Sequence, residues 1–151
     1  MDQISKKIKM ISKKLKDLKN ELYHYGIDGY LVPKNDQYFS EFAQQDKLKT
    51  ITGFSGSFGL AIILKKKNFL FVDGRYTEQA KAQVGKNFKI LEMPKKLPHQ
   101  ILSLNLNLGF DPMVFTSRNL LYYFRNKVRL TQITKTIINS NNSNKLTNCT
   151  L

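Results

Sequence analysis

The segment that decides the fold is Gly59-Leu-Ala-Ile-Ile-Leu-Lys-Lys-Lys-Asn-Phe-Leu-Phe-Val-Asp-Gly-Arg-Tyr-Thr-Glu-Gln-Ala80. Two short apolar runs, Gly59 to Leu64 and Asn68 to Val72, flank three consecutive lysines, a pattern that predicts a β-hairpin with a charged turn. Asp73 follows the second run and is a suitable N-cap for a helix from about Gly74 to Val84. The segment therefore predicts a strand, a turn, a second strand and a helix in direct succession.

Upstream of this segment, apolar residues recur at alternating steps of four and three between residues 3 and 25, which predicts an amphipathic helix that Gly26 ends. The same spacing would suit a coiled-coil seam, but three heptads are short for one, so we expect the stripe to pack on a sheet. Asp28 to Pro33 then reads as a short buried strand that the proline ends. The expected stripe consists of Ile4, Ile8, Ile11, Leu15, Leu18 and Leu22.

Downstream, short strands and helices continue to alternate. The fold class that this order predicts is α/β, with a central mixed β-sheet flanked by helices. From Asn139 onward the chain becomes an Asn-rich stretch with too few apolar residues to form a core, and we expect a loose tail over 139–151 after a domain of residues 1–138. The expected downstream elements are a strand over Phe88 to Leu91, a short helix near His99, a strand over Leu106 to Phe110, a helix capped by Thr116 that runs to about Asn126, and a strand over Val128 to Ile133.

The composition is unusual in its charge. The chain of 151 residues carries a formal net charge of +14, yet only four of its 25 basic residues are arginines. Arginine is the side chain that reads phosphates and base edges with two parallel hydrogen bonds, so its scarcity favours compositional drift, with solvated lysines, over a dedicated nucleic-acid or anionic-surface face. No apolar run is long enough for a membrane span, and the single Cys149 fits a reducing compartment, so the expected location is the cytoplasm.

Two motifs have competing interpretations. The glycines of the segment Gly53 to Gly59 match neither phosphate-binding fingerprint and precede a strand instead of a helix, which favours a tight structural loop over a cofactor loop. The segment Asp73 to Tyr76 lies at a strand-to-helix junction, where functional side chains often project. The structural interpretation is favoured there too: Asp73 caps the helix and Arg75 pairs with a nearby carboxylate.

The residues themselves indicate no catalytic chemistry. His24 and His99 are the only histidines, and neither they nor Cys149 have the spacing of a metal site. The sequence has no Gly-x-Ser-x-Gly elbow, and its carboxylates are few and scattered.

Five segments, in this order, resemble the amino-terminal domain of the creatinase and aminopeptidase P family, most closely that of its three-domain members. Any one of them would be a weak signal, whereas five in the correct order over about 130 residues make a strong match. They are Gly26 to Pro33, Asn35-Asp36 with Ser40-Glu41-Phe42 close behind, Ile51 to Gly59, Asp73 to Ala80, and Leu108 to Pro112.

The resemblance implies a function for the chain as part of a larger enzyme. In that family an α/β amino-terminal domain precedes a carboxy-terminal "pita-bread" domain, which holds two metal ions, usually manganese, and removes an N-terminal residue that precedes proline. The first domain shapes the substrate entrance and helps dimer contacts. The resemblance places five residues of this chain nearest that entrance: Gly53, Phe54, Ser55, Gly56 and Arg75.

The sequence departs from the family pattern after Ile133, where the expected continuation into a next domain gives way to the Asn-rich stretch. The resemblance covers only the first domain, so all expected metal ligands lie elsewhere. We therefore expect a non-catalytic domain, a truncated or split form of an Xaa-Pro aminopeptidase that is inactive alone. Its expected partners are a separately encoded catalytic fragment or a second copy of the chain. The alternative is a small basic protein that binds nucleic acid or an anionic surface.

Overall fold

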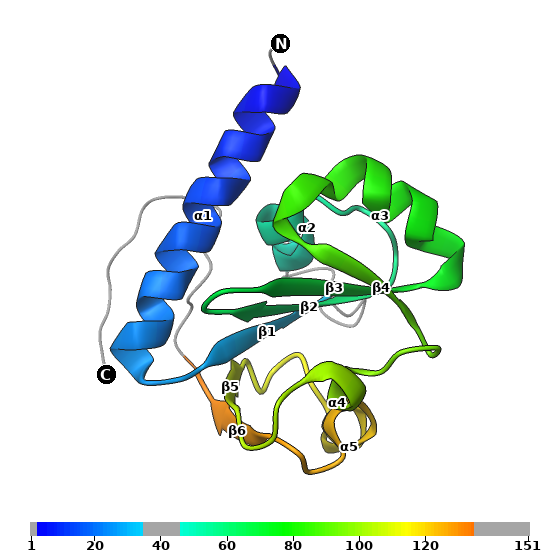
Figure 1. Cartoon of the computed structure of the whole chain (residues 1–151). Coiled ribbons are helices and arrows are strands. Elements are labelled where there is room, and N and C mark those ends of the chain that lie inside the picture. Colours follow the sequence, from blue (N-terminus) through cyan, green and yellow to red (C-terminus); the bar gives the residue numbers. More distant parts are fainter. Residues whose placement is uncertain (1–2, 35–45, 135–151) are drawn as a thin grey trace.

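The structure is a computed structural model that describes residues 3–34 and 46–134. A six-stranded sheet in the order β4-β3-β2-β1-β5-β6 lies between two layers of helices (Figure 1). The strands are β1 (Gly29–Pro33), β2 (Gly59–Leu64), β3 (Asn68–Asp73), β4 (Lys89–Met93), β5 (Asn107–Phe110) and β6 (Arg129–Gln132). The α-helices are α1 (Gln3–Tyr25), α2 (Lys47–Thr52), α3 (Thr77–Val84), α4 (Pro98–Ile101) and α5 (Ser117–Phe124).

The sheet is mixed, as predicted. Strands β1, β2 and β3 pair antiparallel at its centre, while β4 and the β5–β6 pair extend it in parallel on either side. The predicted hairpin between β2 and β3 is confirmed, and its turn closes where the Leu64 N–H donates to the Lys67 carbonyl oxygen at 2.8 Å. Because β2 alone runs in the opposite direction, the carboxyl ends of all other strands lie at the edge of the sheet where β2 begins.

Each face of the sheet has its own core, because side chains alternate between the two faces along every strand. Helices α1, α2 and α3 cover one face, and α4 and α5 lie on the other (Figure 1). On the first face Leu15 and Leu22 of α1 pack with Ile63 and Leu70 of the sheet. On the second face Phe124 of α5 joins the strand residues.

The predicted apolar stripe of α1 is only partly buried. Ile11, Leu15, Leu18 and Leu22 are at most 6% exposed, but Ile8 is 45% exposed, so the expectation that the whole stripe packs on the sheet was wrong at this end. The side chain of Ile4 lies outside the described residues. The physical reason is length: the first turns of α1 project beyond the sheet, where no described helix or strand covers them in Figure 1.

Other expected elements are confirmed with small shifts of their ends. The helix predicted to start at Gly74 begins as a 3-10 turn, Gly74–Tyr76, before α3. The helix predicted to reach about Asn126 ends at Phe124, because Arg125 and Asn126 take left-handed backbone angles (φ 49° and 62°). The expected tail over 139–151 and the motif residues between 35 and 45 lie outside the described residues.

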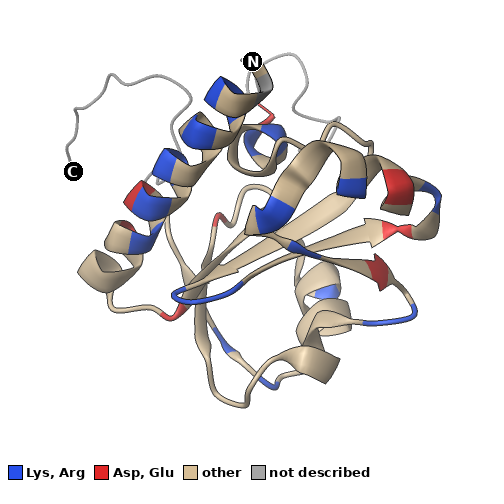
Figure 2. Cartoon of the chain, turned by 45° about the horizontal axis from the view of Figure 1, so that its top comes forward, with Lys and Arg blue, Asp and Glu red and all other residues tan. Residues whose placement is uncertain are grey.

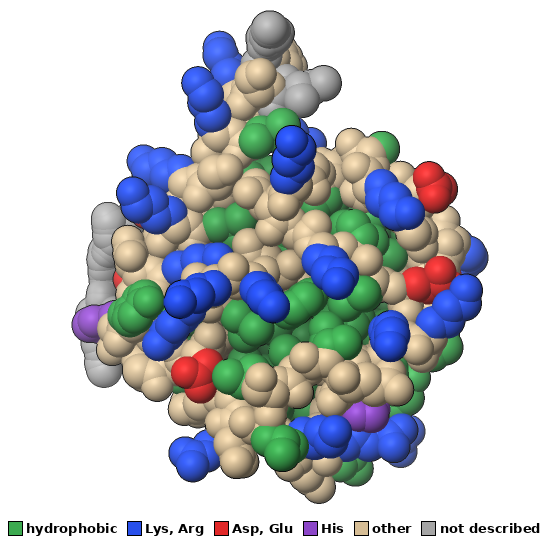
Figure 3. All heavy atoms as spheres, viewed as in Figure 1, with side chains coloured by type: hydrophobic (Ala, Val, Ile, Leu, Met, Phe, Trp, Pro, Cys, Tyr) green, Lys and Arg blue, Asp and Glu red, His purple; other side chains and the backbone are tan. Residues whose placement is uncertain are grey.

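Basic side chains are spread widely over the surface. Lysines follow α1 along its length and recur at the β2–β3 turn (Figure 2). On the face shown in Figure 3, lysines and arginines far outnumber carboxylates and surround a central group of apolar side chains. Within 3–34 and 46–134, no helix is long and apolar enough to span a bilayer.

Candidate functional site

The described parts of the segments that carry the family resemblance meet at one edge of the sheet. Lys34 follows β1, Asp73 ends β3 and Asp111 follows β5, and the loop 53–59 leads into β2 at the same edge. The Lys34 N–H donates to the Gly59 carbonyl oxygen at 2.9 Å, which joins the end of β1 to the start of β2. In open α/β sheets, the edge formed by the carboxyl ends of parallel strands is the usual place for ligands.

The loop 53–59 is a tight structural loop, as the sequence favoured. Gly53 has a φ of 87° and ends α2, with its N–H bonded to the Lys49 carbonyl oxygen at 2.8 Å. The ring of Phe54 is fully buried, and Gly56 lies directly against it: a Cβ at Gly56 would be 2.2 Å from the Phe54 Cζ. Glycine is therefore required at this position by close approach.

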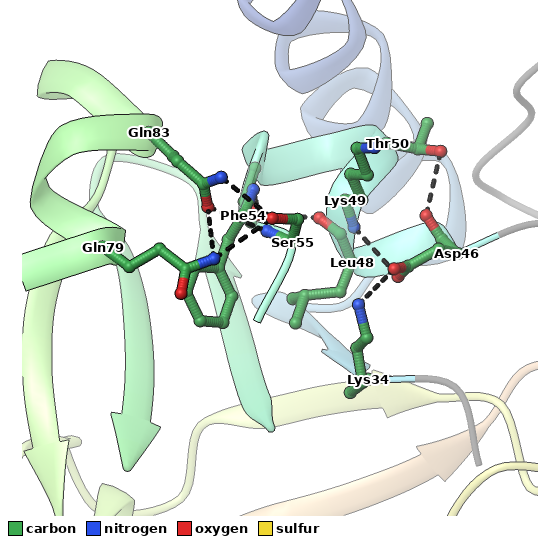
Figure 4. Close-up of polar contacts among 10 residues, drawn as sticks. Lys34, Asp46, Leu48, Lys49, Thr50, Phe54, Ser55, Gln79 and Gln83 are labelled. Atoms are coloured by element: carbon green, nitrogen blue, oxygen red, sulfur yellow. Dashed lines mark hydrogen bonds and ion pairs between the residues drawn. The ribbon is translucent and has the colours of Figure 1, made fainter. Parts of the chain in front are cut away.

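Ser55, at the exposed tip of this loop, is held by two glutamines of α3 (Figure 4). The Ser55 N–H donates to Gln83 Oε1 at 3.0 Å, while the Gln83 Nε2 donates back to the Ser55 Oγ at 2.8 Å. The Gln79 Nε2 donates to the same hydroxyl at 3.1 Å. The three hydrogen bonds fix the loop against the helix that follows Arg75.

Tyr76 joins the loop to the Asp73–Tyr76 segment from the other side. Its hydroxyl lies 2.5 Å from the Ser57 Oγ, and its ring meets that of Phe54 edge-on, with centroids 6.2 Å apart. The structure therefore brings together the two motifs that the sequence analysis singled out.

Arg75 is exposed at this junction, with 74% of its side chain accessible. Asp73 accepts from the Arg75 backbone N–H at 2.9 Å and from the guanidinium at 3.2 and 3.3 Å, which confirms the predicted cap and ion pair. These hydrogen bonds lower the pKa of Asp73 and raise that of Arg75. The guanidinium also lies 5.3 Å from the centroid of the Tyr76 ring.

Helix α2, which the sequence analysis missed, supports the other side of the loop. Asp46 caps it by accepting from the Lys49 N–H at 3.1 Å, and the same carboxylate pairs with the Lys34 ammonium (Figure 4). Thr52 is the last residue of α2, and its Oγ1 links the helix to the loop. This atom donates to the Leu48 carbonyl oxygen at 2.7 Å and accepts from the Phe54 N–H at 3.0 Å.

The expected entrance residues thus divide into two kinds. Ser55 and Arg75 are exposed and can touch a ligand, whereas Gly53, Phe54 and Gly56 are buried and shape the loop. Sequence reasoning gave no role to Gln79, Gln83 or Tyr76. The sequence signal that could have indicated Gln79 and Gln83 was their spacing, because residues four positions apart lie on the same face of a helix.

The described residues offer no candidate metal centre. No group of three or more His, Cys, Asp or Glu side chains in 3–34 and 46–134 could hold a metal ion. His24 is exposed on α1 beside Tyr25, whereas His99 lies in α4, where burial and then the charges of Arg125 and Lys127 lower its pKa. Cys149 lies outside the described residues.

Comparison with known proteins gives the same family as the motifs. The chain is 34% identical over 119 residues to "Probable Xaa-Pro aminopeptidase P" of Coprinopsis cinerea, covering 72% of this chain and 19% of that protein. It is 34% identical over 84 residues to "Xaa-Pro aminopeptidase 1" of Dictyostelium discoideum, covering 54% of this chain and 13% of that protein. The chain thus spans less than a fifth of the length of these relatives.

Solved structures share the fold. An X-prolyl aminopeptidase from Caenorhabditis elegans superposes with a TM-score of 0.69 at 23% identity, over 84% of this chain and 24% of that one. The N-terminal domain of the cytoplasmic peptidase PepQ from Mycobacterium tuberculosis superposes with a TM-score of 0.62 at 21% identity, over 83% of this chain and 95% of that one. The family model for the creatinase/prolidase N-terminal domain matches residues 14–139, and the chain belongs to this family.

Proposed function

We propose that the chain acts as the non-catalytic amino-terminal domain of an Xaa-Pro aminopeptidase and forms part of the substrate entrance. The observation that carries the proposal is the junction of the loop 53–59 with the Asp73–Tyr76 segment, which presents Ser55 and Arg75 to solvent at the ligand-binding edge of the sheet. The relatives that share the sequence are named Xaa-Pro aminopeptidases.

Arg75 is the residue best suited to contact a peptide. The Asp73 carboxylate accepts hydrogen bonds from Nε and Nη2 of Arg75 and so fixes the orientation of the guanidinium. The remaining N–H donors of Arg75 are free to face outward. A planar guanidinium pairs well with a carboxylate or a carbonyl oxygen. Ser55, held rigidly by Gln83, is the second candidate contact.

The chemistry itself belongs to a separate catalytic part. Peptide hydrolysis by two metal ions needs a cluster of carboxylate and histidine ligands, and the described residues of this chain do not fit such a site. The two manganese ions of the family are therefore assigned to the catalytic domain. The partner that supplies the chemistry is a separately encoded catalytic fragment, and the proposed location is the cytoplasm.

The test is complementation. The part of the C. cinerea relative that follows the region matched by this chain is purified, loaded with manganese, and assayed on an Xaa-Pro peptide with and without this chain. We expect a complex on size-exclusion chromatography and a higher kcat/KM. Arg75→Gln should reduce that gain, whereas the matched control Arg118→Gln, an exposed arginine of α5, should retain it. Failure of the two parts to associate, or equal gains with both variants, would reject the proposal.

A further inference from the structure

Lysines recur along α1 (Figure 2). At 100° per residue, Lys6, Lys9, Lys13 and Lys16 fall on one side of the helix, opposite the buried stripe. All four are exposed. With a rise of 1.5 Å per residue, the four ammonium groups are spread over about 15 Å of a straight helix.

This arrangement is unfavourable for the helix itself. The four lysines are spaced three and four residues apart, the spacing at which like charges repel. Lys6 also lies close to the positive dipole end of α1, and the first turn has no acidic residue to offset it. The ion pairs among the described residues all lie elsewhere in the molecule. An external polyanion would relieve this repulsion.

Three further lysines lie at the β2–β3 turn, beyond the lysine-free last turn of α1 (Figure 2). Lys65 connects the two parts, since its Nζ lies 4.4 Å from the centroid of the Tyr23 ring near the end of α1. Tyr23 is 66% exposed. We define the lysine row by these members: Lys6, Lys9, Lys13, Lys16, Lys65, Lys66 and Lys67.

We propose that the lysine row binds the phosphate backbone of a nucleic acid without reading its sequence. A narrow line of cations fits a linear polyanion, and an exposed tyrosine beside it offers a surface on which a base can stack. The scarcity of arginine argues against a reader of base edges but not against contact with the backbone alone, because lysines bind phosphates as point charges. A bilayer fits less well, because the residues from Ile11 onward turn their apolar stripe into the core and leave it unable to insert.

The test uses fluorescence anisotropy with labelled single-stranded and duplex DNA at about 50 and 200 mM salt. The variant Lys6→Gln/Lys9→Gln/Lys13→Gln removes three charges from the row. Its matched control is Lys95→Gln/Lys96→Gln/Lys127→Gln, three exposed lysines near the α4 and α5 layer with the same change in net charge. Circular dichroism melts check that both variants fold.

We expect the wild-type chain to bind both probes with affinity that falls steeply with salt, because binding releases counterions. The row variant should bind at least about tenfold more weakly at low salt, with a salt slope smaller by about 2 to 3 on the duplex. The control variant should keep a near-wild-type slope. Equal losses in both variants would overturn the proposal, since only net charge would then matter. The absence of DNA binding at low salt would also overturn the proposal. A chain that bound only vesicles containing anionic phospholipid, and no DNA, would overturn it for the same reason.

Discussion

Gln83 binds both the backbone N–H and the side-chain hydroxyl of Ser55, although the two residues lie 28 positions apart in the chain. Its carboxamide thereby ties the loop 53–59 to α3. Gln79 adds a second donor to the same hydroxyl. The exposed tip of the candidate entrance is thus held by hydrogen bonds from a helix that no sequence motif linked to it.

Gln83→Ala should lower the free energy of unfolding by about 1–2 kcal/mol, since its two hydrogen bonds with Ser55 and the one from Gln79 are lost at an exposed site. The matched control is Lys81→Ala on the same helix, whose contact with Glu78 is a surface ion pair at 3.9 Å. Surface pairs contribute little, so the control should stay within about 0.5 kcal/mol of wild type. Urea unfolding followed by circular dichroism measures both. Equal stabilities would show that the Ser55 contacts do not hold the loop.

Gly56→Ala should destabilise the chain by about 1–3 kcal/mol, because the new methyl group meets the buried Phe54 ring and forces it to move. The double variant Gly56→Ala/Phe54→Leu tests this cause directly. A smaller side chain at position 54 leaves room for the methyl group, so the two changes together should cost less than the sum of their separate costs. Strict additivity in a thermal or urea melt would contradict the steric explanation.

Arg75→Gln should reduce the thermal midpoint at neutral pH and have no effect in strong acid. Arg75 lowers the pKa of Asp73 in the folded chain below its ordinary value of 3.8. Because the pKa of Asp73 is lower in the folded chain than in the unfolded chain, its ionised carboxylate stabilises the fold at any pH above the unfolded-state pKa. That contribution is lost as the pH falls through the folded-state pKa. The difference between wild type and variant should therefore shrink as the pH falls below 3.8 and vanish once Asp73 is protonated in the folded chain as well. Arg118→Gln serves as the control and should show no such pH dependence.

Part of this site could be predicted from the sequence because its signals are local. The cap at Asp73 and the tight glycine loop depend on residues within a few positions of one another. The contact of Ser55 with Gln83 and the ion pair of Lys34 with Asp46 depend on how distant segments pack, which one sequence does not reveal.

The missed helix and the exposed Ile8 have the same kind of cause. Helix α2 has six residues, too few for a periodic apolar pattern, and its only signals were Asp46 at its start and Gly53 at its end. Periodicity placed Ile8 on the correct side of α1, but the extent of the sheet beneath it decides burial. Sequence patterns of this kind give the orientation of an element and not the size of the surface that it covers.

The purified chain should not hydrolyse Xaa-Pro peptides by itself when manganese is added. The described residues contain no cluster of ligands for a two-metal site, and hydrolysis by metal-bound water requires one. The assay follows release of the N-terminal residue from an Xaa-Pro peptide over a manganese titration. A chelator-treated sample is the baseline. Turnover that depends on manganese and co-purifies with the chain through several columns would overturn the assignment as a non-catalytic domain.

Leu15→Ala and Ile8→Ala together test how α1 packs. Leu15 is 5% exposed and Ile8 is 45% exposed, although both belong to the same predicted stripe. Truncating the buried leucine should cost about 2–5 kcal/mol, a large share of the 5–15 kcal/mol that typically stabilises a domain. Truncating the exposed isoleucine should cost less than about 1 kcal/mol. The thermal midpoint should not change with protein concentration in either variant or in the wild type. If α1 instead paired with a second copy as a coiled coil, the midpoint would rise with concentration, and Ile8, as part of the seam, would matter about as much as Leu15.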